Sequence, residues 1–163
     1  MEKLTDFNDG PSLPSGFSSV KAIVEPDYRL IAALSTAQQT FVLSDPSQTD
    51  NPITYASPSF LALTGYTLKE VVGRNCRFLQ GPETSHAAIK EIKDAVGRGE
   101  DISLCLLNYK KDGSPFWNQV FIAPLKDTSG KVVSYVGVQC EVTVEGVLGA
   151  STVGGVYGDG GTK

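Results

Sequence analysis

The chain has 163 residues and a mass of 17.3 kDa, the size of one ordinary domain, so two large domains are excluded. Forty per cent of the residues are hydrophobic and 20% are charged, a balance that supports a buried core rather than disorder throughout. The net charge is −4 and no block of five basic residues occurs, so we do not expect the chain by itself to bind the phosphate backbone of nucleic acids.

The sequence disfavours membrane segments, disulfides and metal sites. No apolar run approaches the roughly 20 residues that span a bilayer, and the first residues lack an apolar segment of the secretory kind. The three cysteines, Cys76, Cys105 and Cys140, show no C-x-x-C spacing, and His86 is the single histidine. We therefore expect a soluble, intracellular protein without a metal site, and a surface position for His86.

Composition divides the chain into four parts. Residues 1–27 are rich in proline, glycine and serine and predict a flexible N-terminal arm or linker. Residues 28–37 place apolar side chains at helical spacing and predict a flanking amphipathic helix. Residues 38–141 are dense in periodic apolar positions and form the predicted domain. Residues 142–163 hold seven of the 17 glycines and predict a largely mobile tail, because glycine loses the most backbone entropy on ordering.

Local signals mark the first elements of the predicted domain. Residues 40–44 and 53–56 predict two strands joined as a hairpin. Ser57, followed by proline, is an N-cap signal, and Thr67 with Glu70 fits a capping box. We therefore expect short helices to begin at both places.

The second half of the domain predicts one longer helix and three strands. Residues 84–96 carry apolar side chains on one side, and Gly97 and Gly99 are expected to end the helix. The strands are predicted at 102–110, 115–126 and 131–141, joined by glycine-containing turns. Two strands, a block of short helices and three strands indicate an α+β domain, a five-stranded antiparallel sheet with its helices on one face.

Three carboxamides point to the same face of this sheet. Side chains alternate across a strand, so Asn108, Asn118 and Gln139 lie on the apolar inward faces of the last three strands. An unpartnered buried amide costs about 1–3 kcal/mol. The amides suit the polar edge of a flat heterocycle, although pairing with strand ends or buried water is the simpler alternative. The surfaces expected to contact its faces are Leu104, Leu106, Val120, Ile122 and Tyr135, with Gly137 leaving room.

The opposite face of the sheet is too apolar to be left bare. We expect the helix at 28–37 to cover part of it and a second copy of the domain to cover the rest, in a homodimer. The residues predicted on this outer face are Cys105, Leu107, Tyr109, Trp117, Phe121, Val136, Val138 and Cys140.

A second cluster of polar groups lies in the segment 73–81, GRNCRFLQG. If it forms a helical turn, Cys76 and Gln80 project in the same direction, because residues four apart are neighbours on a helix. Arg77 would then stand at the mouth of the pocket, ready for a phosphate or carboxylate. Alone, a cysteine here is also compatible with a small buried hydrophobe and the arginine with a solvated surface charge.

The segment 73–82, GRNCRFLQGP, resembles the signature of LOV domains, the flavin-binding, blue-light-sensing branch of the PAS superfamily. The resemblance extends over roughly residues 38–141 through DPSQTDNPITYAS, FLALTGY, LLNY, DGSPFWN and YVGVQC. It implies a PAS/LOV fold and flavin mononucleotide (FMN) as the cofactor. The run at 34–43, LSTAQQTFVL, looks most like the aureochromes, in which such a domain follows a basic leucine zipper; phototropins, in which it controls a kinase, are the competing source.

The resemblance assigns roles residue by residue. Cys76 matches the photoactive cysteine, whose sulfur adds reversibly to flavin C4a under blue light. Asn108 and Asn118 match the amides on the pyrimidine edge. Gln139 matches the glutamine beside N5 and O4, whose amide rotates when N5 becomes a donor and relays the signal. The remaining matched positions contact the ribityl phosphate tail or line the pocket: Val42, Ser44, Asn51, Asn75, Arg77, Leu79, Gln80, Ile92, Val96, Leu106, Val120, Ile122, Tyr135 and Gly137.

Two positions depart from the commonest phototropin pattern. Lys93 stands where a second phosphate-binding arginine is usual, and Tyr135 stands where phenylalanine is. Lysine keeps the charge but loses the bidentate fork, which puts discrimination between FMN and shorter riboflavin in doubt.

The predicted function is sensory rather than enzymatic. The sequence shows neither a paired carboxylate nor a nucleophile with a base beside it. Contact with DNA, and a nuclear location, would come only through an aureochrome-type output domain absent from this sequence. A light-independent PAS module for redox or ligand sensing is the alternative from another class.

Overall fold

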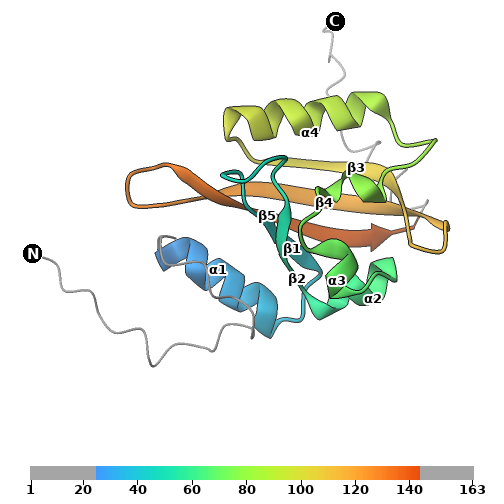
Figure 1. Ribbon diagram of the computed structural model, residues 1–163, viewed down its shortest axis with the longest axis horizontal. Coiled ribbons are helices and arrows are strands. Elements are labelled where there is room, and N and C mark those ends of the chain that lie inside the picture. Colours follow the sequence, from blue (N-terminus) through green and yellow to red (C-terminus); the bar gives the residue numbers. More distant parts are fainter. Residues whose placement is uncertain (1–24, 144–163) are drawn as a thin grey trace, which may run out of the picture.

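The computed structural model describes residues 25–143 (Figure 1). The helices are α1 (Glu25–Thr36), α2 (Pro58–Thr64), α3 (Leu68–Val71), the 3-10 helix η1 (Cys76–Leu79) and α4 (His86–Arg98). The strands are β1 (Phe41–Ser44), β2 (Ile53–Ala56), β3 (Ile102–Tyr109), β4 (Pro115–Lys126) and β5 (Val132–Val142). None of the helices in this described range is long and apolar enough to cross a membrane.

The five strands form one antiparallel sheet in the order β2-β1-β5-β4-β3, which confirms the predicted α+β architecture. β1 and β2 pair as the predicted hairpin, with Val42 opposite Ala56. The chain returns to the sheet at its far edge with β3, and β5 closes it by inserting between β4 and β1. The last strand is therefore central and is hydrogen-bonded to both halves of the sheet.

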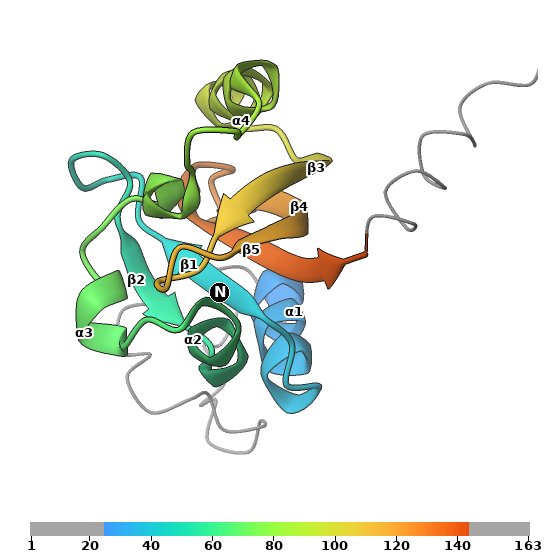
Figure 2. The same cartoon turned by 90° about the vertical axis from the view of Figure 1, so that its right-hand side faces the viewer.

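Alternate residues of β1 enter two different cores, one on each face of the sheet. Val42 packs with residues of β2, α2 and α3, whereas Phe41 and Leu43 pack with Ile31 of α1. This alternation follows from the two-residue period of a strand. Figures 1 and 2 show the consequence, since α1 and α4 lie on opposite sides of the sheet. We call the α4 side the inner face and the α1 side the outer face.

Local capping signals predict the start of the short helices correctly. The Ser57 hydroxyl accepts hydrogen bonds from the backbone N–H groups of Phe60 and Phe41, so it caps α2 and ties it to β1. Thr67 and Glu70 form the predicted capping box at α3. The capping bonds themselves join residues three apart, which is why the two helix starts can be predicted from sequence.

The longer helix is displaced from its prediction by two residues. α4 spans His86–Arg98 and not 84–96, because Ser85 is the cap and the Thr84 hydroxyl instead donates to the Leu107 carbonyl at 2.7 Å. Gly97 does not end the helix and lies within it. Gly99 ends it, with φ of +67° in the left-handed region that favours glycine. His86 is exposed, as expected.

The flanking helix begins three residues before its predicted start. α1 runs from Glu25 to Thr36, and a proline in its first turn is compatible with a helix because that turn needs no N–H donor. The carboxylate of Asp27 accepts a hydrogen bond of 3.1 Å from the backbone N–H of Lys126, at the irregular end of β4. The predicted arm as far as residue 24 and the predicted tail from residue 144 lie outside the described residues, and Val142 belongs to β5.

α1 covers only part of the outer face. Ile31 is fully buried against Leu125 and Val136, with Val138 packed beside them. Further along the sheet, Phe121 keeps 39% of its surface exposed and Cys140 is exposed. The predicted covering of the outer face by this helix is therefore confirmed over β1, β5 and the end of β4.

Candidate functional site

Three adjacent strands bring the three predicted amides to the inner face of the sheet. Asn108, Asn118 and Gln139 are all buried, with exposed fractions of 4%, 1% and 8%. The Nδ2 group of Asn118 donates to Oδ1 of Asn108 at 2.9 Å. Asn108 in turn donates to the carbonyl of Leu107 at 3.3 Å. Part of the polar capacity is thus satisfied internally, by a bond between two of the amides and a bond to a neighbouring backbone carbonyl.

The remaining amide oxygens are not satisfied. Within the described residues, Oδ1 of Asn118, Oε1 of Gln139 and Oδ1 of Asn51 are buried without a hydrogen-bond partner. Such a group costs about 1–3 kcal/mol, so two on neighbouring strands of one face are an expensive arrangement for a protein to keep. Both are acceptors on residues of the inner face, and the polar edge of a flavin ring offers an N–H donor beside carbonyl and imine acceptors, which a set of carboxamides can complement.

Gly137 makes a smooth section of wall next to these acceptors. A Cβ at this position would lie 3.3 Å from Nε2 of Gln139 and 3.4 Å from a methyl group of Val42. Around it, Val42, Leu106 and Val120 are buried and apolar. A flat ring system can approach such a wall closely, so the residues present fit a flavin.

Tyr135 departs from the family pattern without leaving a polar group unpaired. Its ring is buried on the inner face, and its hydroxyl donates to the carbonyl of Val96 at 2.7 Å. The added oxygen therefore fastens β5 to α4, and desolvation raises the pKa of the phenol.

η1 presents the predicted cysteine. Asn75 caps it by accepting a hydrogen bond of 3.0 Å from the backbone N–H of Arg77. The turn is a 3-10 helix, in which residues three apart share a side, so Leu79 and not Gln80 is the helical neighbour of Cys76. Gln80 follows the helix in extended conformation. The predicted helical turn is confirmed but ends at Leu79, so the expectation that Cys76 and Gln80 belong to one helix is wrong.

The Cys76 thiol lies in an apolar environment. It packs against the core formed by Val42, Val71 and Leu79. Desolvation raises its pKa from 9.0 to about 12, and the nearby charge of Arg77 opposes this only in part. The group is therefore a neutral thiol at physiological pH.

Arg77 does not stand free at the mouth of a pocket. Its two Nη groups donate to the two carboxylate oxygens of Asp50 at 2.5 and 2.6 Å. The Nδ2 group of Asn75 donates to the Asp50 carbonyl at 2.8 Å. Sequence reasoning missed Asp50, which is 27 positions away from Arg77. The only available signal was its place before Asn51, a predicted tail contact.

The other predicted tail and wall residues occupy the loops and elements around the inner face. Lys93 of α4 is exposed, whereas Ile92 and Val96 of the same helix are half-buried. Ser44 is buried at the end of β1, and its carbonyl accepts from the Ser134 hydroxyl at 2.8 Å. Gln80 and Ile122 are half-buried. Their contacts with a cofactor remain predictions.

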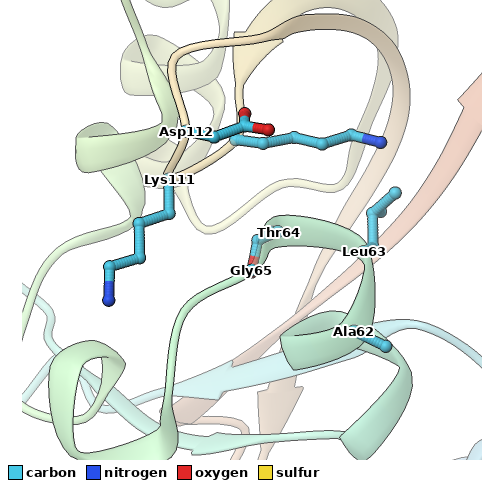
Figure 3. Close-up of a pocket in the computed structure, with 7 residues that line it drawn as sticks. Ala62, Leu63, Thr64, Gly65, Lys111 and Asp112 are labelled. Carbon is cyan, nitrogen blue, oxygen red and sulfur yellow. The ribbon is translucent and has the colours of Figure 1, made fainter.

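A separate open depression of about 510 Å³ lies between the end of α2 and the β3–β4 turn (Figure 3). It is lined by Ala62, Leu63, Thr64, Gly65, Lys110, Lys111 and Asp112, and none of the predicted site residues takes part. Lys111 is held there by its backbone bond to Thr64 and by its ion pair with Glu70. The depression is therefore a surface feature distinct from the inner-face wall that carries Asn108, Asn118 and Gln139, which we call the amide wall.

Comparison with known proteins identifies the family. The PAS domain model matches residues 39–144. Rice phototropin-2 is 49% identical over 128 residues, which are 78% of this chain and 14% of the phototropin. A blue-light-activated histidine kinase of Brucella abortus is 39% identical over 135 residues, 83% of this chain and 27% of the kinase. The chain thus spans only a small part of these relatives.

Solved structures agree with this assignment. A light-oxygen-voltage domain studied with a flavin analogue is 58% identical, with a TM-score of 0.75, and the match covers 78% of this chain and 95% of that one. The dark structure of the aureochrome1 LOV domain is 50% identical, with a TM-score of 0.71, and covers 81% and 98%. The chain therefore belongs to the PAS family, in its blue-light-sensing LOV branch.

Proposed function

We propose that this LOV domain binds FMN on the inner face of its sheet and senses blue light through Cys76. The observation that carries the proposal is the pair of buried, unpartnered oxygens on Asn118 and Gln139, beside the side-chain-free surface of Gly137. The N3–H of an oxidised flavin would donate to one such acceptor, and the carbonyl oxygens and N5 of the ring would accept from the NH2 groups of the carboxamides.

In the proposed complex the sheet contacts the flavin ring, and the loops and helices at the edge of the inner face contact the ribityl phosphate tail. Asn108, Asn118 and Gln139 would hold the polar edge of the ring. The walls would be Val42, Leu79, Leu106, Val120, Ile122, Tyr135 and Gly137. The ribityl phosphate tail would lie among Ser44, Asn51, Asn75, Arg77, Gln80, Ile92, Lys93 and Val96.

Bound flavin would supply blue absorption and an electrophilic C4a carbon. Cys76 would contribute its sulfur, which bonds to C4a, while the thiol proton passes to N5. In darkness the bond would break and the proton would return to the sulfur of Cys76. A thiol whose pKa is raised to about 12 suits this task because it retains the proton that the reaction needs.

Gln139 would carry the change to the outer face. When N5 changes from acceptor to donor, the amide of Gln139 would rotate so that its unpaired oxygen accepts from it. The backbone N–H of Gln139 donates to Thr40 at 2.9 Å, in the connection between α1 and β1. Val136 and Val138 of the same strand pack against α1. A small change of polarity in β5 can therefore shift the packing of this helix.

The output of such a sensor would be carried by a separate domain. We propose an aureochrome-type role in regulating a transcription factor, with DNA contact and nuclear location supplied by that output domain; control of a kinase, as in phototropins, is the alternative. The domain itself would be a sensor and not an enzyme. We further propose that the part of the outer face around Phe121 and Cys140, which α1 leaves exposed, supports a homodimer or light-dependent association.

Flavin titration of matched variants tests the binding site. Asn118→Leu should weaken FMN binding about tenfold or more, because it removes an acceptor at the ring edge. Gln119→Leu is the control, since Gln119 lies next to Asn118 on the same strand, faces outward and donates to Ser103 at 3.0 Å. Quenching of flavin fluorescence measures both affinities. Equal FMN affinities in the two variants would show that Asn118 does not contact the flavin and would contradict the proposed site.

A further inference from the structure

Asp50 joins the β1–β2 loop to η1 at the rim of the inner face. Its carboxylate receives both Nη groups of Arg77, and its carbonyl receives the Asn75 amide. Asn75 also accepts from the backbone N–H of Arg77. Arg77 of η1 and the cap residue Asn75 are thus both bound to one residue of the loop.

The backbone of this loop is held in an uncommon conformation. Asp50 and Asn51 have φ values of +70° and +45°, in the left-handed region that few residues other than glycine adopt. Such a conformation persists where surrounding bonds determine it. The next side chain, Asn51, has a buried oxygen without a partner. A flavin tail that passed at this rim would supply, through its hydroxyl groups, the donor that this oxygen lacks.

The carboxylate and a ligand phosphate need the same donors. The guanidinium presents a planar fork that binds either anion in bidentate fashion. In this structure the fork is already bound to Asp50, and the hydrogen bonds from Arg77 hold the pKa of Asp50 below its usual range, so the carboxylate stays charged. Lys93, the other predicted phosphate contact, is exposed and has no such fork.

We infer that Asp50 competes with the flavin phosphate for Arg77 and thereby sets the preference of the site for FMN over riboflavin. The inference rests on the proposed function. The effect is moderate in size, because the Arg77 and Asp50 side chains are 59% and 51% exposed and an exposed ion pair is weak. Removing the competitor should strengthen FMN binding about two- to fivefold. Riboflavin lacks the phosphate, so its affinity should not change.

Separate titrations of FMN and riboflavin into the flavin-stripped full chain test this. Asp50→Asn keeps the size of the side chain and suits a positive φ, and it should raise the FMN-to-riboflavin affinity ratio about two- to fivefold. Glu100→Gln is the matched control, because Glu100 pairs with Arg98 at 2.8 Å on the surface, and it should leave the ratio unchanged. If Asp50→Asn folds poorly in circular dichroism, Asp50→Gly replaces it, since glycine also tolerates this φ.

Each outcome decides between distinct possibilities. A ratio that rises, and rises less in 1 M salt, supports competition for the guanidinium. A ratio that is unchanged, or that falls because Asp50 positions Arg77 for the phosphate, overturns the inference while flavin binding stands. Equal shifts for both flavins also overturn it, because they indicate a structural effect on the loop. If the wild-type chain binds neither flavin, the proposed function itself fails.

Discussion

The protonation of Cys76 can be tested directly by alkylation in the dark. The pH is varied in a variant that carries Cys105→Ala and Cys140→Ala, so that Cys76 is the one remaining thiol. A cysteine with the ordinary pKa of 9.0 is about one-tenth thiolate at pH 8, whereas a pKa of about 12 leaves about one part in ten thousand. Since only the thiolate reacts, Cys76 should react about 1000-fold more slowly than an unburied cysteine.

The shape of the pH profile separates pKa from steric protection. Burial alone would lower the rate by a constant factor, but a raised pKa keeps the rate climbing about tenfold per pH unit through pH 9 to about pH 11. The assay follows iodoacetamide labelling of Cys76 by mass, with circular dichroism recording the folded state at each pH. A rate that levels off at or below pH 9 would refute the reasoning that desolvation governs this thiol.

The same shift makes stability depend on pH in the alkaline range. The native state keeps its proton where the unfolded chain loses it, so the contribution of Cys76 is complete below pH 9 and is lost as pH rises towards 12. A shift of three pKa units corresponds to a change of at most about 4 kcal/mol in the free energy of unfolding, and the change is smaller here because Cys76 is partly exposed. The free energy of unfolding of Cys76→Ala should therefore fall less steeply with rising pH than that of the wild type.

Three further predictions concern packing and charge. Gly137→Val should abolish flavin binding measured by fluorescence titration, because its side chain would meet the Gln139 amide on the pocket wall, and full retention would contradict the proposed wall. Ile31→Ala should lower the free energy of unfolding in urea by about 2–4 kcal/mol, since Ile31 is fully buried under α1; a loss below about 1 kcal/mol would mean that α1 does not dock stably. Hydrogen bonding from Lys111 lowers the pKa of Glu70 to about 2, so its contribution to stability is present above pH 4.5 and is lost as pH falls through 2. Glu70→Gln should flatten the acid unfolding curve in this window, and an unaltered curve would show that the pair is not formed in solution.

Features that depend on short-range chemistry were predictable from sequence. The caps at Ser57 and Thr67 involve atoms within four residues, and the inward placement of Asn108, Asn118 and Gln139 follows from strand alternation. The five-stranded sheet followed from the order of the elements. These are the parts of the fold in which neighbouring residues decide the outcome.

Features that depend on tertiary contacts could not be predicted from sequence. The sequence predicts a helix start at Thr84, but the Thr84 hydroxyl donates to the Leu107 carbonyl and Ser85 caps the helix instead. Asp50 reads as a loop residue, and its partnership with Arg77 exists only once the β1–β2 loop meets η1. No local pattern encodes either bond.

One absorption trace tests the central claim most directly. The purified protein loaded with FMN is recorded before, during and after blue illumination, alongside Cys76→Ala. We predict that the blue absorption of the wild type bleaches in the light and returns in darkness, while Cys76→Ala holds flavin and does not bleach. A wild type that binds no flavin, or a Cys76→Ala variant that bleaches and recovers like the wild type, would contradict the account.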